Sequence, residues 1–266
     1  MPKKMPIDIA SQPVEEDRHF VTSLARGLEI LKAFRGVDRL LGNAELVART
    51  NLPKSTVARL TRTLERLDYL RYEPRLAKYK LSTALLSFGY ALLRDLEVPR
   101  IASSLMRDLA AHGAVNVGIA IADGIDMVYL DTALGGGNNV YRLSTGNIIP
   151  MEETAIGQAY FAGQSIERRK SLLVEIKTKR PDSFSQVKRE LDKACDEIST
   201  QGFCIREWQS DIIAAGAPLI DASGTCEFAV NCGAPKFLLD RERLQNDIAP
   251  RLVNLAANVR RGLSIG

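Results

Sequence analysis

Apolar residues recur at helical spacing near the start of the chain. One series ends close to Gly36 and consists of Leu24, Leu28, Leu31 and Phe34. A series of this kind marks the buried face of an amphipathic helix. A shorter segment, AELVART, follows Asn43, and asparagine is a favourable N-cap residue. The pattern therefore predicts two helices before residue 51.

The stretch from Asn51 to Leu70 reads NLPKSTVARLTRTLERLDYL and predicts a third helix. Proline fits the first turn of a helix, where its missing N–H is not needed, so this helix is expected to begin near Pro53. Its apolar face is expected to be buried and contains Val57, Leu60, Leu64 and Leu67. The other face carries Ser55, Arg59, Arg62 and Arg66. Taken alone, that face fits either an ordinary solvated helix or one that reads DNA.

The next segment, RYEPRLAKYKLS, predicts two short strands around a turn at Pro74. Two helices joined by a tight turn and followed by a hairpin match a winged helix-turn-helix. The hairpin carries four cations: Arg71, Arg75, Lys78 and Lys80. A wing normally contacts sugar and phosphate, so these residues are expected to position the protein on DNA rather than to read bases.

From Thr83 to about Glu97 the chain predicts a helix that is apolar on more than one side. Its main stripe is Leu85, Phe88, Leu92 and Leu96, with Leu86 and Leu93 outside it. Such a helix needs partners on more than one side, so we expect it to connect two domains and to contact a second copy of the chain. A dimer suits DNA reading, because two-fold proteins bind half-sites about 34 Å, or multiples of that, apart.

Beyond Pro99, strand and helix patterns are mixed. A helix is predicted from Ile101 to His112, followed by a hairpin in VNVGIAIADGIDMVYLD and a third extended piece, NNVYRLS. Helices are predicted over 154–162, 166–177, 185–201 and 241–261, and two strands flank SGT in AAGAPLIDASGTCEFAVNCG. This order predicts an α+β domain with an antiparallel or mixed sheet and helices on its faces.

The charge is divided unevenly along the chain. The 266 residues carry a net charge of +4, but residues 20–84 hold thirteen Lys and Arg against six Asp and Glu. Residues 85–266 hold twenty against twenty-two. Clustered positive charge is typical of nucleic-acid binding, because it releases the counterions condensed on phosphates. The charge distribution therefore favours the DNA-reading interpretation of the third helix.

Several function classes find little support. The longest apolar runs are near half of the roughly 20 residues that a bilayer span needs. Residues 1–19 lack the apolar centre of a secretory signal, so we expect a disordered tail on a cytoplasmic protein. Four cysteines without CxxC spacing and two histidines indicate no metal site, and no cofactor is expected. Motifs of the GxSxG, HExxH and P-loop types are lacking, so an enzyme is not expected.

The segment PMEETAIGQAYFAG holds the clearest candidate for a ligand site. It places the hydroxyl and backbone N–H groups of Thr154 to Gly157 at the start of a helix, where a small polar or anionic group could bind. An ordinary capped helix would have the same sequence. Glu152 and Glu153 precede it, and adjacent residues point about 100° apart, so they favour a dipole-stabilising first turn over an acid/base pair.

The order of SLARGLEIL, NLPKSTVARLTRTLERLDYL, the hairpin, TAIGQAYFA, QGFCIRE, GAPLIDASG and AVNCGAP resembles the IclR family of bacterial transcription regulators, over about residues 20–262. The resemblance implies a winged helix-turn-helix (20–82), a linker helix (83–98) and a GAF-like effector-binding domain (99–262). It also implies homodimers or homotetramers on double-stranded DNA.

For the DNA contacts, the resemblance implies that the third helix enters the major groove with Lys54, Ser55, Thr56, Arg59 and Arg62, with Arg66 as a solvated charge or phosphate contact. The implied effector pocket is lined by Gly118, Ile119, Tyr129, Thr154, Ala155, Ile156, Gly157, Asp211, Asn231 and Cys232. The expected effector is an organic or aromatic acid of a catabolic pathway.

One departure from the family pattern bears on the effector. Glu152 and Glu153 stand where members usually have a histidine or a small residue, and they would repel a carboxylate unless they point outward or Arg142 offsets them. Two other interpretations stay open. The protein could be a ligand-binding protein or small-acid enzyme whose winged helix contacts other proteins, or a DNA-binding protein whose second domain only oligomerises.

Overall fold

The computed structural model describes residues 19–35, 38–136, 144–209 and 211–263. The chain divides into two compact units, residues 1–95 and 96–266, and each is described separately. The tail predicted over residues 1–19 lies, apart from His19, outside the described residues.

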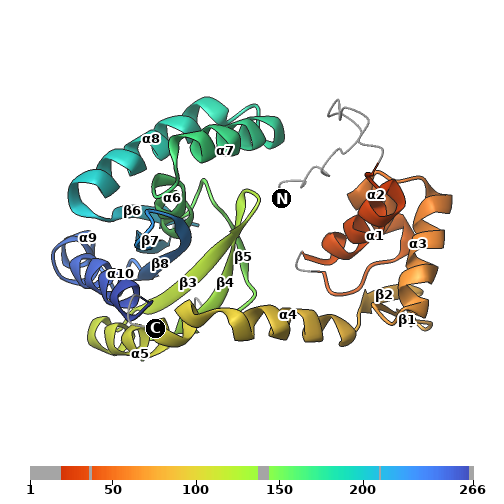
Figure 1. Cartoon of the computed structure of the whole chain (residues 1–266), viewed down its shortest axis with the longest axis horizontal. Coiled ribbons are helices and arrows are strands. Elements are labelled where there is room, and N and C mark those ends of the chain that lie inside the picture. Colours follow the sequence, from red (N-terminus) through yellow and green to blue (C-terminus); the bar gives the residue numbers. More distant parts are fainter. Residues whose placement is uncertain (1–18, 36–37, 137–143, 210, 264–266) are drawn as a thin grey trace. The chain divides into compact units, whose positions relative to one another are not determined.

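The first unit has the predicted winged helix-turn-helix (Figure 1). Its elements are α1 (Thr22–Lys32) with a following 3-10 turn (Ala33–Arg35), α2 (Asn43–Thr50), α3 (Lys54–Arg66), β1 (Leu70–Glu73), β2 (Lys78–Leu81) and α4 (Ala84–Asp95). The wing is antiparallel, with Leu70 opposite Leu81 and Glu73 opposite Lys78. Residues 36–37, where α1 was predicted to end, lie outside the described part.

The core of the first unit differs from the predicted apolar faces at four positions. It is built on Ile30, Phe34, Leu41, Leu46, Leu52, Val57, Leu64 and Leu70. Leu24 and Leu28 of the predicted α1 stripe are exposed instead. Leu67 follows the last turn of α3 and is 59% exposed, whereas Thr61 is fully buried. The Thr61 hydroxyl donates to the Val57 carbonyl at 3.0 Å, so its polar group is satisfied within the helix.

Glu45 and Asn51 fix the start and the end of α2. The N-cap is Gly42 rather than the predicted Asn43, and its N–H donates to one oxygen of the Glu45 carboxylate. Lys78 of the wing donates to the other oxygen of that carboxylate at 2.5 Å. Asn51 ends α2 in the left-handed conformation, with φ 56°, which asparagine tolerates better than most residues. Thus Glu45 joins α2 to the wing, and Asn51 forms the turn that leads into α3.

The second unit confirms the predicted α+β fold. Its elements are α5 (Glu97–Gly113), β3 (Asn116–Asp123), β4 (Asp126–Ala133), β5 (Ile148–Pro150), α6 (Ala155–Ala162), α7 (Ile166–Lys179), α8 (Phe184–Gln201), β6 (Cys204–Trp208), β7 (Ile212–Ile220), β8 (Cys226–Pro235), α9 (Arg241–Arg243), a π-helical turn (Leu244–Ile248) and α10 (Ala249–Leu263). The strands form one antiparallel sheet in the order β5-β4-β3-β8-β7-β6.

Two details of this unit differ from the predicted pattern. The strands β5 and β6 were not predicted, and both lie at sheet edges. The helix predicted over 241–261 is interrupted by the π-helical turn. The extended piece predicted at NNVYRLS falls almost wholly within residues 137–143, outside the described part.

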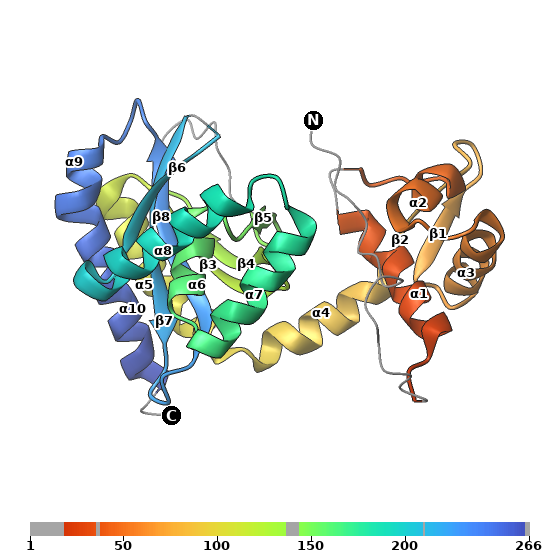
Figure 2. The same ribbon diagram turned by 90° about the horizontal axis from the view of Figure 1, so that it is seen from above.

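Helices cover both faces of the sheet (Figure 2). One core cluster lies between the sheet and α5 with α10, and the other lies between the sheet and α6 to α8. Side chains alternate along β8 accordingly: Val230 and Cys232 belong to the α5/α10 core, whereas Ala229 belongs to the α6 core. Residue 231, between Val230 and Cys232, therefore points to the α6 side.

The first turn of α6 lies directly on β7. A Cβ on Gly216 would stand 2.1 Å from the carbonyl oxygen of Ala155, so no residue with a side chain fits there without moving the helix. Thr154 caps α6, and its hydroxyl accepts from the Gly157 N–H at 3.3 Å while donating to the Pro150 carbonyl at 2.8 Å. The TAIG segment is thereby fixed over the centre of the sheet.

Candidate DNA interface and effector pocket

The outer face of α3 is basic and exposed. Lys54, Ser55, Arg59, Arg62 and Arg66 are exposed along it, and Thr56 is half-buried. Val57 and Leu64 anchor the opposite side in the core, so the orientation of the basic face is fixed. The guanidinium groups of the three arginines make no hydrogen bond or ion pair with other described residues. These guanidinium groups can therefore hydrogen-bond to another molecule.

The four wing cations fall into two pairs. Lys78 is held by Glu45, and Lys80 lies 4.0 Å from Glu73. Arg71 and Arg75 are exposed and have no ion pair among the described residues. Arg75 lies in the turn between the two wing strands. The local charge of Lys78 is offset, whereas that of Arg75 is not.

A small pocket lies on the α6 side of the sheet. Its wall is formed by Tyr129, Ile149, Thr154, Ala155, Arg206, Trp208, Ile212, Ala214, Asn231 and Gly233. Four of these belong to the implied effector set: Tyr129, Thr154, Ala155 and Asn231. The cavity measures about 20 Å³, which is room for about one water molecule.

The other six residues of the implied set lie around the pocket or away from it. Gly118 does not line the pocket but lies directly against the Tyr129 ring, which does. A Cβ on Gly118 would stand 2.4 Å from that ring. Ile156 is in the α6 core, and Gly157 lies against the backbone of Met151. Ile119 and Cys232 point to the opposite face of the sheet, in the α5/α10 core. Asp211 is exposed in the connection between β6 and β7.

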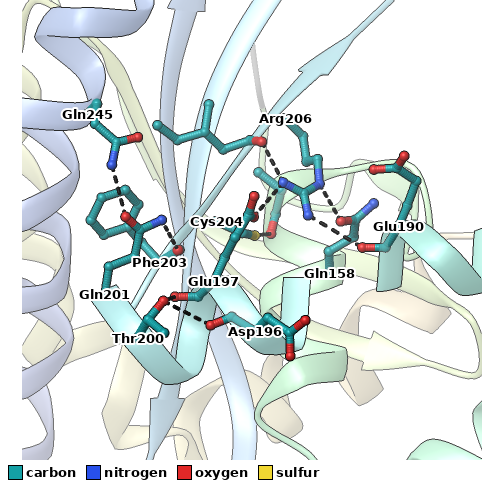
Figure 3. A network of polar contacts seen from close by, with 12 residues as sticks. Gln158, Glu190, Asp196, Glu197, Thr200, Gln201, Phe203, Cys204, Arg206 and Gln245 are labelled. Carbon is teal, nitrogen blue, oxygen red and sulfur yellow. Dashed lines mark hydrogen bonds and ion pairs between the residues drawn. The ribbon is translucent and has the colours of Figure 1, made fainter. Parts of the chain in front are cut away.

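Arg206 on β6 is a pocket residue that sequence reasoning missed. Its side chain is only 9% exposed, and its guanidinium is held by four hydrogen bonds (Figure 3). Nε donates to the Gln158 side chain, Nη1 to Glu197 Oε2 at 2.6 Å and to the Ile205 carbonyl, and Nη2 to the Glu190 carbonyl. The signal available in the sequence was a charged residue directly after the apolar run FCI, in the segment FCIREW.

This network joins the pocket to the outer helices. Gln158 belongs to α6, and its amide donates to the Glu152 carbonyl at 2.8 Å, while Glu190 and Glu197 belong to α8. Arg206 therefore connects a pocket wall with two helices at once. A buried guanidinium is tolerated here because a carboxylate and several oxygens compensate it.

Glu152 and Glu153 do not line the pocket in the structure. The side chain of Glu152 is completely buried and lies 2.7 Å from Arg180 Nε, and Arg180 also pairs with the exposed Glu153. Burial raises the pKa of the Glu152 carboxyl, an effect that the Arg180 charge opposes. Arg180 thus does what was expected of Arg142, which lies outside the described residues.

Three thiols are unsuited to catalysis. Burial raises the pKa of Cys204, Cys226 and Cys232 to about 12, so they are protonated at neutral pH and none is a reactive thiolate. Among the described residues, no group of three or more His, Cys, Asp and Glu side chains could hold a metal ion. The helices of this part of the chain are all too short or too polar to cross a bilayer.

Comparison with solved structures supports the fold. A crystal structure of an IclR family transcriptional regulator from Brucella abortus has a TM-score of 0.86 and 37% identity, covering 95% of this chain and 96% of its own. An IclR homologue complexed with 4-hydroxybenzoate, from Microbacterium hydrocarbonoxydans, is similar in fold, with a TM-score of 0.68, 17% identity and coverage of 92% and 100%.

Curated relatives are also transcriptional regulators. The HTH-type transcriptional regulator TsaQ1/TsaQ2 of Comamonas testosteroni is 26% identical over 249 residues, which is 92% of this chain and 89% of the relative. The p-hydroxybenzoate hydroxylase transcriptional activator of Acinetobacter baylyi is 24% identical over 250 residues, 91% of each chain.

Family models match both units of the chain. The model of the IclR helix-turn-helix domain matches residues 23–74, which include α3 and the first strand of the wing. The model of the bacterial transcriptional regulator IclR C-terminal domain matches residues 90–261, which include the pocket. The chain therefore belongs to the IclR family of bacterial transcriptional regulators.

Proposed function

We propose that this regulator binds a specific operator through α3, and that a small organic acid in the pocket on the α6 side changes this binding. It acts in the cytoplasm as a homodimer or homotetramer and is a switch rather than a catalyst. The observation that carries the proposal is the fixed, exposed face of α3, whose three guanidinium groups have no partner among the described residues.

The proposed roles of the α3 residues follow from groove chemistry. Arginine can donate two hydrogen bonds to the O6 and N7 atoms of guanine, so Arg59 and Arg62 are proposed to read bases. Lys54, Ser55 and Thr56 lie in the first turn of α3, and recognition helices present that turn to the groove floor. Arg66, in the last turn, is proposed to contact phosphate. In vitro selection from random duplexes tests this proposal, because a specific reader enriches one consensus.

The two kinds of wing cation are expected to differ in salt dependence. Arg75→Ala should weaken binding to all duplexes alike and make the slope of log K against log salt shallower by about 0.9, the value for one lost phosphate contact. Lys78→Ala should change this slope less, because Glu45 already offsets the ammonium charge. Fluorescence anisotropy over a salt series measures both slopes. Equal slopes for Arg75→Ala and wild type would rule out the Arg75 contact.

An acidic effector is proposed from the character of the pocket wall. Tyr129, Trp208, Ile149 and Ile212 offer aromatic and aliphatic surface, and Arg206 supplies the only cationic side chain among the described residues of the wall. Two family members add support: one activates a gene for p-hydroxybenzoate hydroxylase, and another was crystallised with 4-hydroxybenzoate. The Glu152 and Glu153 carboxylates are compensated by Arg180 and do not line the wall, so they leave room for an anion.

The small size of the cavity suggests how a ligand could alter DNA binding. An aromatic acid is far larger than the roughly 20 Å³ present, so side chains of the wall must move to admit it. The wall residue Arg206 is hydrogen-bonded to Gln158 of α6 and to Glu190 and Glu197 of α8. A ligand shifts an equilibrium only if it binds two arrangements with different affinity, and displacement of this network would supply such a difference.

The homodimer is proposed from apolar side chains that the first unit exposes. On α4, Leu86 and Tyr90 are 57% and 68% exposed and lie one turn apart, and Leu92 is exposed as well. On α1, Leu24 and Leu28 are exposed at the same spacing. Exposed apolar groups gathered on helices mark interaction surfaces, and a two-fold reader needs a second copy of α3.

Charging the exposed face of α4 is expected to dissociate the proposed dimer. The double variant Leu86→Lys/Tyr90→Lys should halve the molar mass measured by light scattering, since burying two ammonium groups in an apolar interface is unfavourable. Ser87→Lys, at another exposed position of α4, is the matched control and should keep the mass of wild type. An unchanged mass for the double variant would place the interface elsewhere.

A further inference from the structure

Asn231 is a side chain of the pocket wall whose buried oxygen has no hydrogen-bond partner among the described residues. The Thr154 hydroxyl is already hydrogen-bonded to the Pro150 carbonyl and the Gly157 N–H, and Arg206 makes four hydrogen bonds. Asn231 is only 6% exposed, and its Oδ1 is buried without a hydrogen-bond partner among the described residues. Such a group is costly unless something else in the functional state supplies the missing bond.

In the sheet, the strand neighbours of Asn231 offer its side chain no hydrogen-bond partner. On β8, Asn231 lies between Gly118 of β3 and Gly216 of β7, its directly paired neighbours. Neither neighbour has a side chain that could reach the amide. A Cβ on Gly118 would stand 3.0 Å from Asn231 Oδ1, and one on Gly216 would meet the first turn of α6. The amide of Asn231 is therefore flanked in the sheet by two glycines, Gly118 and Gly216. It lies close to Tyr129 and α6 and lines the cavity.

From this geometry we infer that Asn231 determines specificity by hydrogen bonding to a hydroxyl group of the effector. The inference rests on the proposed function of this pocket and narrows its ligand class from organic acids to hydroxy acids. A hydroxyl both donates and accepts, so it satisfies the amide of Asn231 in either orientation of its oxygen and nitrogen. A bare ring or alkyl chain would leave the buried oxygen unpaired, and a methoxy group has no proton to donate to it.

Sites that bond a ligand hydroxyl discriminate strongly against analogues that lack it, because the site's own polar group is then buried and unpaired. Losing one such bond is expected to weaken binding on the order of 10- to 100-fold. The aromatic and aliphatic remainder of the wall contributes to affinity but cannot distinguish a hydroxyl from its absence by this margin.

The test uses matched ligand series and the full-length protein. Calorimetric titrations compare 2-, 3- and 4-hydroxybenzoate with benzoate and the three methoxybenzoates, and 3-hydroxybutyrate with butyrate. We expect at least one hydroxy acid to bind wild type at least 10-fold more tightly than its deoxy counterpart and, in the benzoate series, than its methoxy counterpart as well. Equal affinities within every series, or no binding by any member, would overturn the inference.

Two variants of Asn231 assign the preference to this residue. Asn231→Leu keeps the approximate volume and removes the amide, and it should bind the hydroxy and deoxy acids equally. Asn231→Ser keeps a hydroxyl in case the leucine variant fails to fold, and it should retain part of the preference. Asn254→Leu makes the same change at an exposed position of α10 and should leave the preference intact. A preference that survives in Asn231→Leu would also overturn the inference.

Operator binding by the same wild-type preparation separates this inference from the proposed function. If the protein binds a selected duplex but distinguishes no hydroxy acid, the inference fails and the DNA-binding function stands. If it prefers a hydroxy acid through Asn231 but binds no duplex specifically, the inference stands and the proposed function fails.

Discussion

Replacing Arg59 with alanine is expected to weaken specific operator binding by about 1 to 3 kcal/mol, or about 5- to 150-fold, the value of one good bidentate contact with a base. The side chain is exposed on α3, and its guanidinium has no partner among the described residues, so its removal should leave the free energy of unfolding nearly unchanged. Anisotropy titrations with the selected duplex and with single-base variants measure the effect.

The matched control for this prediction lies on the same helix. Arg66→Ala removes an identical side chain from the last turn of α3. It is expected to lower the affinities for the selected and the scrambled duplex by the same factor. Arg59→Ala should instead reduce the ratio of the affinity for the selected duplex to the affinity for the scrambled duplex. If the ratio is the same in Arg59→Ala as in wild type, Arg59 does not read a base.

Replacing Arg206 with methionine is expected to destabilise the second unit by about 3 kcal/mol, the lower end for removing one partner of a buried ion pair. The substitution leaves Glu197 with no guanidinium at 2.6 Å and removes the donor to the Gln158 side chain. Glu197 is 20% exposed, so water recovers part of the loss. Urea unfolding followed by circular dichroism gives the difference in free energy.

Two further variants show whether the cost comes from the unpaired carboxylate. Arg206→Met/Glu197→Leu removes both charges and should recover much of the lost stability, because an apolar pair of similar volume can replace a buried ion pair. Arg251→Met breaks only an exposed pair with Asp247 and should change stability far less than Arg206→Met does. Equal stability of Arg206→Met and Arg251→Met would show that the Arg206 network is not structural.

The sequence predicted the winged helix-turn-helix because local signals agreed there. Pro53 gave the start of α3, and the spacing of Val57 and Leu64 gave its buried side. Leu67 was wrongly assigned to that side, because periodicity does not show that the helix ends at Arg66 and that the chain turns before Leu70.

The pocket was less accessible to sequence reasoning, because its parts are distant along the chain. Asn231 and Cys232 were both taken from the resemblance, yet adjacent strand residues face opposite sides of the sheet, and only the strand register assigns each side. The partners of Arg206 lie on α6 and α8, and nothing local to FCIREW indicates them. Likewise, Arg180 is 28 residues from Glu152 along the chain, so their ion pair could not be read from the sequence.

The claim that α3 reads DNA is tested most directly by titrating the full-length wild-type protein with its selected duplex and a scrambled duplex of the same composition at two salt concentrations. We predict that the selected duplex binds at least about 10³-fold more tightly at physiological salt, the lower end for specific DNA binders. Both affinities should fall steeply as salt rises. Equal affinity for the two duplexes, or binding that does not respond to salt, would contradict the account.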